Sequence, residues 1–120
     1  MAQIDIVRSD GTAAAFRVRL AETPEEHRRG LMHVRHLDAD EGMLFVFDPP
    51  RKVAFWMRNT HVPLDMIFIR PDGIIGSIKT RRDTGSDAAT ASGFAVGAVL
   101  EIRAGRAAAL GIEAGDRLRR

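Results

Sequence analysis

The most chemically useful side chains of this sequence lie within one ten-residue stretch and are Trp56, Arg58, Asn59, Thr60 and Asp65. A guanidinium binds carboxylate or phosphate groups through paired N–H donors. The indole offers an apolar face, and the amide, hydroxyl and carboxylate groups add hydrogen-bonding capacity. Together these groups could hold a small polar or anionic ligand. The competing interpretation is structural: Asn59 and Asp65 cap turn amides, Trp56 fills the core and Arg58 forms a local ion pair.

Strongly apolar segments surround this stretch and must position it. Met43 to Phe47 is apolar at every position and is followed by Asp48-Pro49-Pro50. This pattern predicts a strand that is buried on both faces and is stopped by prolines, which cannot donate to a sheet. Asp65 to Ile69 predicts a second strand of the same kind. We expect both strands in the core.

A shorter extended segment, Val53 to Met57, leads into the polar residues. Side chains alternate along a strand, so its odd-numbered residues share one face, while Trp56 and Arg58 share the other. The turn that follows contains Asn, Thr and Pro, which favour turns. We expect this turn to bring Asn59 close to Asp65, at the end of the strand that carries the indole and the guanidinium.

Turn and capping signals predict the elements of the N-terminal part. Residues 2–7 and 14–20 alternate around Ser9-Asp10-Gly11, which predicts a β-hairpin. Thr23-Pro24-Glu25-Glu26 predicts a capping box, from which a helix runs to about Met32. Gly30 near its end would permit close packing on the sheet. Residues 33–41 are polar and predict a loop.

The C-terminal part reads as further strands with one short helix. Pro71-Asp72-Gly73 predicts a turn before a strand at 74–80, and residues 97–103 predict another strand. The small, polar segment between them predicts a mobile loop or a lid. An Ala-rich helix at 104–110 and a strand at 117–119 follow. The whole pattern predicts one mainly β domain over residues 1–120, an antiparallel sandwich or a partly open barrel with one or two short helices.

Composition argues against several classes of function. Without cysteine, the chain forms neither disulfides nor thiolate metal sites. The net charge of +2 comes with scattered basic pairs and no basic–aromatic stripe, which argues against nucleic-acid binding. No run approaches the roughly 20 apolar residues of a membrane-spanning helix. No charged leader precedes an apolar run, so the sequence fits the cytoplasm, or the periplasm or secretion if a leader was removed. It gives no indication of the oligomeric state.

Familiar catalytic motifs are missing. There is no nucleophile elbow, phosphate-binding loop or dinucleotide fingerprint, and we expect no cofactor. Of the four histidines, only His33 and His36 lie close in sequence, in a predicted loop, and we expect no metal site. Glu101 is flanked by apolar residues on a predicted strand. It is either a solvated outer residue or a buried partner for an arginine such as Arg29 or Arg58.

Six short motifs follow one another along nearly the whole chain: Arg29-Gly-Leu-Met32, Gly42-Met-Leu-Phe-Val-Phe47, Phe55-Trp-Met-Arg-Asn-Thr60, Pro63-Leu-Asp-Met-Ile-Phe68, Leu100-Glu101 and Gly115-Asp116. Together they resemble the family called domain of unknown function 192. The resemblance implies a small, mainly β domain, found chiefly in bacteria and archaea, without an established activity. It also implies that a cation matters at position 58, where the family often has lysine, and that His61 lies at a variable position.

These observations predict a non-enzymatic binding module for a small polar or anionic ligand, or for a peptide segment, at the strand and turn of residues 56–65. Trp56 would form the floor, Arg29 and Arg58 the cationic contacts, and the polar residues of the turn, Asp65 included, the hydrogen-bonding groups. One alternative is a hydrolase or lyase with Asp65 or Glu101 as general base, which requires that carboxylate to stand in an open pocket. Another is a structural or oligomerisation domain whose apolar strands form an interface.

Overall fold

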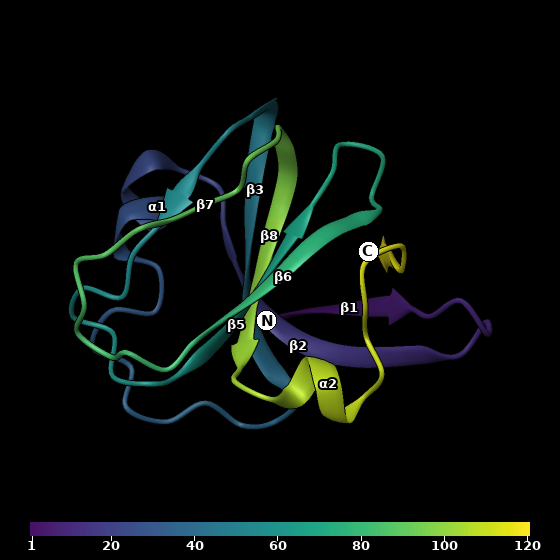
Figure 1. Cartoon of the computed structure of the whole chain (residues 1–120), viewed down its shortest axis with the longest axis horizontal. Coiled ribbons are helices and arrows are strands. Elements are labelled where there is room, and N and C mark those ends of the chain that lie inside the picture. Colours follow the sequence, from purple (N-terminus) through teal and green to yellow (C-terminus); the bar gives the residue numbers. More distant parts are fainter.

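Seven strands form one curled sheet in the computed structural model, which describes residues 1–120 (Figure 1). In sheet order they are β6 (Ile75–Arg81), β5 (Leu64–Ile69), β8 (Val96–Arg103), β3 (Glu41–Arg51), β2 (Ala13–Ala21), β1 (Ala2–Val7) and β9 (Arg117–Arg119). A separate pair is made by β4 (Ala54–Phe55) and β7 (Thr90–Ala91), and the helices are α1 (Pro24–Arg29) and α2 (Arg106–Ala109). Only β2 and β3 run parallel; the other neighbours are antiparallel.

The two ends of the curled sheet meet without closing fully. A single bridge joins Ile74, just before β6, to Arg117 of β9, and the Leu118 N–H donates to the Gly73 carbonyl at 2.8 Å. The predicted mainly β fold, a partly open barrel with two short helices, is therefore confirmed. Neither helix has the length or the apolar character needed to cross a membrane.

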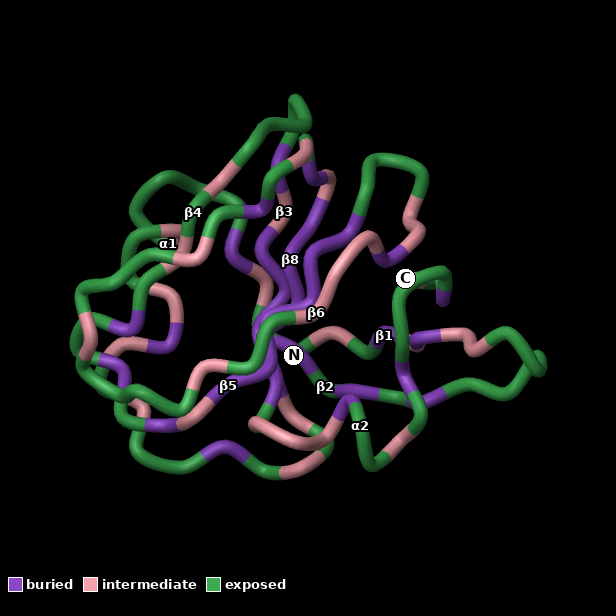
Figure 2. Tube along the Cα trace, viewed as in Figure 1, coloured by how far each residue is buried: buried purple, intermediate pink, exposed green.

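The central strands are buried on both faces, as the apolar runs predict. All six residues of β5 are buried, and the purple tube of Figure 2 follows β3, β5 and β8 through the middle of the molecule. One hydrophobic cluster, which includes Phe16, Leu44 and Leu100, fills the face turned toward β1, β2 and α2. A second cluster, which includes Phe45 and Phe68, fills the face turned toward α1 and β4. Burial of this apolar surface is the dominant favourable contribution to folding.

The α1 helix begins at the predicted capping box. The Thr23 hydroxyl accepts from the Glu26 N–H at 3.2 Å, and the Glu26 carboxylate accepts from the Thr23 N–H at 3.0 Å. The helix ends at Arg29, earlier than the predicted Met32, because Gly30 adopts a positive φ of 47°. A Cβ at Gly30 would lie 3.2 Å from the Phe45 ring, so this glycine does permit close packing on the sheet.

The polar segment between β6 and β8, which the sequence predicts as a mobile loop or a lid, is held in place by strand pairing and side-chain hydrogen bonds. Its middle forms β7, which pairs with β4. Arg81 ties the rest down: its guanidinium donates to the Ala88 carbonyl at 2.8 Å, to the Thr90 hydroxyl at 2.7 Å and to the Asp83 carboxylate at 2.8 Å. The bond from Arg81 lowers the pKa of Asp83 to about 2. The segment is thus a fixed wall beside residues 53–60.

Candidate functional site

A cleft of about 1160 Å³ opens between α1 with the residues that follow it and the segment 51–58. Its floor lies on β3 and β8. In Figure 1 the cleft corresponds to the side of the sheet that carries α1, β4 and β7, away from β1, β2 and α2. The site is therefore built on the face of the second hydrophobic cluster.

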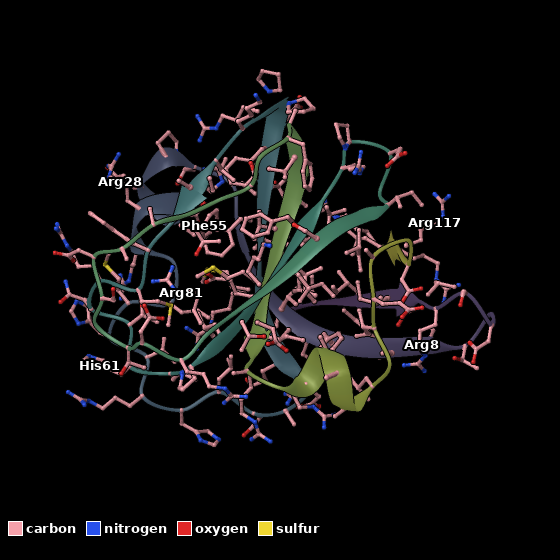
Figure 3. All side chains as sticks on the ribbon, viewed as in Figure 1. Arg8, Arg28, Phe55, His61, Arg81 and Arg117 are labelled. Atoms are coloured by element: carbon pink, nitrogen blue, oxygen red, sulfur yellow. The ribbon has the colours of Figure 1, made fainter.

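The floor of the cleft is aromatic. Phe45 and Phe47 come from β3, and Phe55 reaches in from β4. The Phe55 ring meets the Phe45 ring edge-on, with 4.8 Å between centroids, and Figure 3 shows Phe55 lying between α1 and the central strands. His27 of α1 packs on Phe47 with ring centroids 4.4 Å apart. These edge-on and tilted contacts are the favoured aromatic geometries, and they fix the rings in place.

The wall formed by residues 51–58 is fastened to the segment that contains β7. The Val53 N–H donates to the Ser92 hydroxyl at 3.0 Å, and the Ser92 N–H donates to the Val53 carbonyl at 2.8 Å. Met57 is fully buried, and its N–H donates to the Ser86 carbonyl at 3.0 Å. Because Met57 points inward, its neighbour Trp56 points outward and is 41% exposed. The interpretation of Trp56 as a core residue, or as the floor of the site, is therefore wrong; the indole lies on the rim.

Five cationic side chains surround the cleft: Arg28, Arg29, Arg51, Lys52 and Arg58. Only Arg58 forms an ion pair, through its Nε and the Asp87 carboxylate at 2.8 Å. Its guanidinium also stacks on the Trp56 ring, 3.9 Å from the centroid. The other four cations carry no ion-pair partner, and in Figure 3 the labelled Arg28 extends outward from α1. The rim therefore offers unneutralised positive charge to an anion.

Glu101 is the buried acidic group of the floor. It lies on β8 directly between Met43 of β3 and Met66 of β5, on the cleft face, and is 3% exposed. Its carboxyl forms no hydrogen bond or ion pair within the chain, and its oxygens are not among the fully inaccessible unpartnered atoms, because the residue lines the cleft. Burial raises the pKa of Glu101 to about 8. Desolvation disfavours the charged form when nothing compensates it.

Both sequence-based interpretations of Glu101 are wrong. It is not a solvated outer residue, because β8 is an inner strand with both faces covered. It is also not paired with Arg29 or Arg58, which remain on the rim. The alternation of side chains along the strand correctly places Glu101 and Leu100 on opposite faces of β8. It cannot indicate that both of these faces are covered.

The sequence-predicted site residues divide into two groups. Arg29, Trp56, Arg58 and Thr60 line the cleft. Thr60 is buried, and its hydroxyl donates to the Arg58 carbonyl at 3.2 Å, so it shapes the wall. Asn59 does not line the cleft; it has a left-handed φ of 53°, and its carbonyl accepts from the His33 N–H at 2.8 Å.

Asp65 also lies outside the cleft, on the opposite face of the sheet. Its neighbour Met66 pairs with Glu101 on the cleft face, so alternation turns Asp65 the other way. Its carboxylate accepts from the Thr80 hydroxyl at 2.6 Å and from the Gly105 and Ala107 N–H groups at 3.1 and 3.0 Å. Asp65 thus joins β5, β6 and the start of α2, which is a structural role.

Sequence reasoning missed part of the site. His27 places its Nε2 3.0 Å from the Ala21 carbonyl and 2.9 Å from the Val46 carbonyl, so this nitrogen carries the proton. Its Nδ1 is buried without a partner. Arg51 and Lys52 were also missed. The prediction that the prolines end the strand is wrong, because β3 continues through Pro49 and Pro50 to Arg51, which pairs with Val96 of β8. No three potential metal-ligating side chains gather into a cluster.

Comparison with known proteins agrees with the resemblance noted from the motifs. A family model described as "Uncharacterized ACR" matches residues 5–120. A crystal structure from Sinorhizobium meliloti 1021, described as a candidate transcription regulator, is 39% identical with a TM-score of 0.94, covering 98% of this chain and 91% of that one. A protein of unknown function from Novosphingobium aromaticivorans DSM 12444 is 36% identical with a TM-score of 0.94, covering 98% and 84%. No protein with a curated description matches the chain.

Proposed function

Since the chain belongs to the DUF192 family, whose description names no activity, we propose a function from the geometry of the cleft: a binding module for a small organic anion. The charged group of the anion contacts Arg29 and the neighbouring rim cations. Its apolar body lies on the phenylalanine rings of the floor. Asn59 and Asp65 have no part in this site.

The surplus of unpaired positive charge above an aromatic floor is the observation that carries the proposal. Four unpaired cations line the cleft, whereas its only carboxylates are Glu25 and Glu101. Guanidinium groups bind carboxylate and phosphate through directed pairs of hydrogen bonds. A concave, mostly apolar site with a few polar groups is the usual form of a small-molecule site. Charge and shape therefore favour the same class of ligand.

Two other kinds of partner fit this geometry less well. A peptide segment typically adds to an exposed sheet edge or lies in an extended groove, whereas this cleft is a concavity between α1 and the 51–58 wall, with its floor on the inner strands β3 and β8. The relative from S. meliloti is described as a candidate transcription regulator. The helices here contain six and four residues, which is too short for a recognition helix in the major groove. We therefore do not propose a DNA site for this chain.

Titration calorimetry at low ionic strength tests the proposal with phenyl phosphate and benzoate, and with benzyl alcohol as the neutral counterpart. The anions should bind and the alcohol should not. Arg29→Ala should weaken anion binding about tenfold, which corresponds to the loss of one charge-assisted contact. Arg19→Ala, at an exposed position of β2 outside the cleft, removes the same charge and should leave affinity unchanged. Equal binding by both variants, or no anion binding at all, would contradict the proposed site.

A second candidate function has one specific observation in its favour. Glu101 is a buried carboxyl with a raised pKa, faces an open cleft, and so meets the requirement for a general acid or base in a hydrolase or lyase. Asp65 does not, because its carboxylate is occupied by three donors. Turnover of a panel of small carboxylic and phosphoric esters that Glu101→Gln abolishes would establish this activity. Binding without turnover in wild type would exclude it for those substrates.

The apolar strands do not favour an oligomerisation domain. They are covered within the chain, and the only exposed large hydrophobic residues are Met1 and Trp56.

A further inference from the structure

Building on the proposed function, we infer that the cleft selects a zwitterion whose ammonium group reaches Glu101 at the floor while its anionic group contacts the rim cations. The proposal specifies the ligand class of the site: an ω-amino acid or a similar molecule, with its two charges separated by an apolar chain. It assigns to Glu101, which has no partner within the chain, the role of recognising the cationic end.

The surroundings of Glu101 explain why it needs a partner from outside. The side chains facing it across both neighbouring strands are Met43 and Met66, neither of which donates a hydrogen bond. A carboxyl group buried among apolar side chains either keeps its proton or is compensated by a cation. With 3% exposure and no internal partner, Glu101 keeps its proton in the free protein, and burial sets its pKa at about 8.

The chain's own cations stay out of reach of this carboxyl. None of the five that line the cleft forms an ion pair with Glu101, although four of them have no other ion-pair partner. The remaining titratable groups of the cleft are Glu25, His27 and His33, and none of them is bonded to Glu101 either. Positive charge at the rim and an acid at the floor are therefore separate features, and one ligand with two charges can satisfy both.

The aromatic rings suit the same ligand. Phe45, which lines the cleft, lies opposite Val99, two residues from Glu101 on the same face of β8. In a sheet such diagonal neighbours are about 7–8 Å apart, within reach of a bound group between them. Aromatic faces attract ammonium groups and pack against methylene chains. An α-amino acid has adjacent charges and cannot place one at the floor and the other on the rim.

Binding of an ammonium group at Glu101 should release a proton. At pH 7 the Glu101 carboxyl is mostly protonated, since its pKa is about 8. When an ammonium group takes the place of that proton, the carboxylate becomes the favoured form, and close to one proton leaves per molecule bound. An anion that contacts only the rim releases none.

The experiment compares 5-aminopentanoate with pentanoate and pentylamine, by calorimetry in two buffers of different ionisation enthalpy. In wild type, 5-aminopentanoate should bind at least tenfold more tightly than either singly charged analogue and should release close to one proton. Glu101→Gln should remove that preference. Glu113→Gln, at an exposed glutamate outside the cleft, should behave as wild type. Lengths from 3-aminopropanoate to 6-aminohexanoate locate the optimum spacing.

The outcomes separate the inference from the proposed function. If pentanoate and 5-aminopentanoate bind equally well to wild type and both depend on Arg29, the anion site stands and the zwitterion inference is wrong. If neither compound of the series binds, and phenyl phosphate does not bind either, both fail. Proton release is measured on wild type, so the inference is tested even if Glu101→Gln does not fold. Tight binding of 5-aminopentanoate without proton release would also overturn the role of Glu101.

Discussion

Replacement of Glu101 by methionine should stabilise the protein relative to wild type, and the difference should increase as the pH rises. In the native state burial raises the pKa of Glu101 from its ordinary value of 4.5 to about 8. Between these values the native state holds a proton that the unfolded chain has released, so the free energy of unfolding falls as the pH rises and then levels off above pH 8. Within this window the free energy of unfolding falls by about 1.4 kcal/mol for each pH unit. The total loss of stability reaches about 4–5 kcal/mol by pH 8.

Methionine is the matched replacement because Glu101 lies between Met43 and Met66. It has nearly the same volume and no charge, so it should pack without a cavity. The difference in unfolding free energy between Glu101→Met and wild type should therefore be smallest near pH 5 and should grow in favour of the variant by about 4 kcal/mol at pH 8. Urea unfolding of both proteins from pH 5 to pH 9 measures it, with Glu25→Gln as the control that should track wild type.

A constant difference over this range would refute the reasoning, because it would mean that Glu101 titrates alike in the folded and unfolded states. Groups such as Asp83, whose pKa lies near 2, titrate below the window and cancel between the two proteins. The comparison thus isolates the buried carboxyl.

Four further substitutions test other parts of the structure by denaturant unfolding. Asp65→Ala should cost about 3 kcal/mol or more, because it leaves one hydroxyl and two backbone N–H donors without an acceptor. Trp56→Ala should cost about 1 kcal/mol or less, since the indole is 41% exposed, whereas Phe45→Ala should cost about 3–5 kcal/mol. Arg81→Ala should cost about 2 kcal/mol and speed amide exchange and proteolysis in residues 83–91, because it removes the bonds that hold this wall.

Asp65→Ala and Arg81→Ala each have a counterpart that should be nearly silent. Asp72→Ala removes one exposed bond, to the Ile74 N–H, and Arg82→Ala removes an exposed arginine next to Arg81. If Asp65→Ala is no worse than Asp72→Ala, the carboxylate does not support α2 as described. If Arg82→Ala loosens residues 83–91 as much as Arg81→Ala does, the bonds from Arg81 are not what fixes that segment.

The strands and turns were predictable because their signals are local. The unbroken apolar run from Met43 to Phe47 indicates burial on both faces, and it lies in an inner strand with the neighbours such burial needs. The capping box at Thr23 satisfies two backbone N–H donors through residues of the same turn, so it does not depend on what the helix packs against. The segment 53–57 was predicted as a full strand, but only Ala54 and Phe55 find a partner, because β7 is equally short.

The site was only partly predictable, because its charges come from separate regions. Arg29 ends α1, whereas Arg51 ends β3, and only the folded sheet brings them to one rim. Alternation fixes the face of Asp65 relative to Met66, but which face carries the cleft depends on where α1 crosses. The pairing of β8 with both β3 and β5 joins segments that lie far apart in the sequence. Only this pairing shows that Glu101 is a buried acid of the floor and not a surface residue.

The claim that the cleft binds an anion at its cationic rim is tested most directly by methyl NMR of the five methionines during titration with phenyl phosphate. Met32 lines the cleft, and Met1 lies outside it. The account predicts a saturable shift of the Met32 methyl resonance, lost in Arg29→Ala, while the Met1 resonance does not move. An unchanged Met32 resonance, or shifts of the same size at Met1, would contradict it.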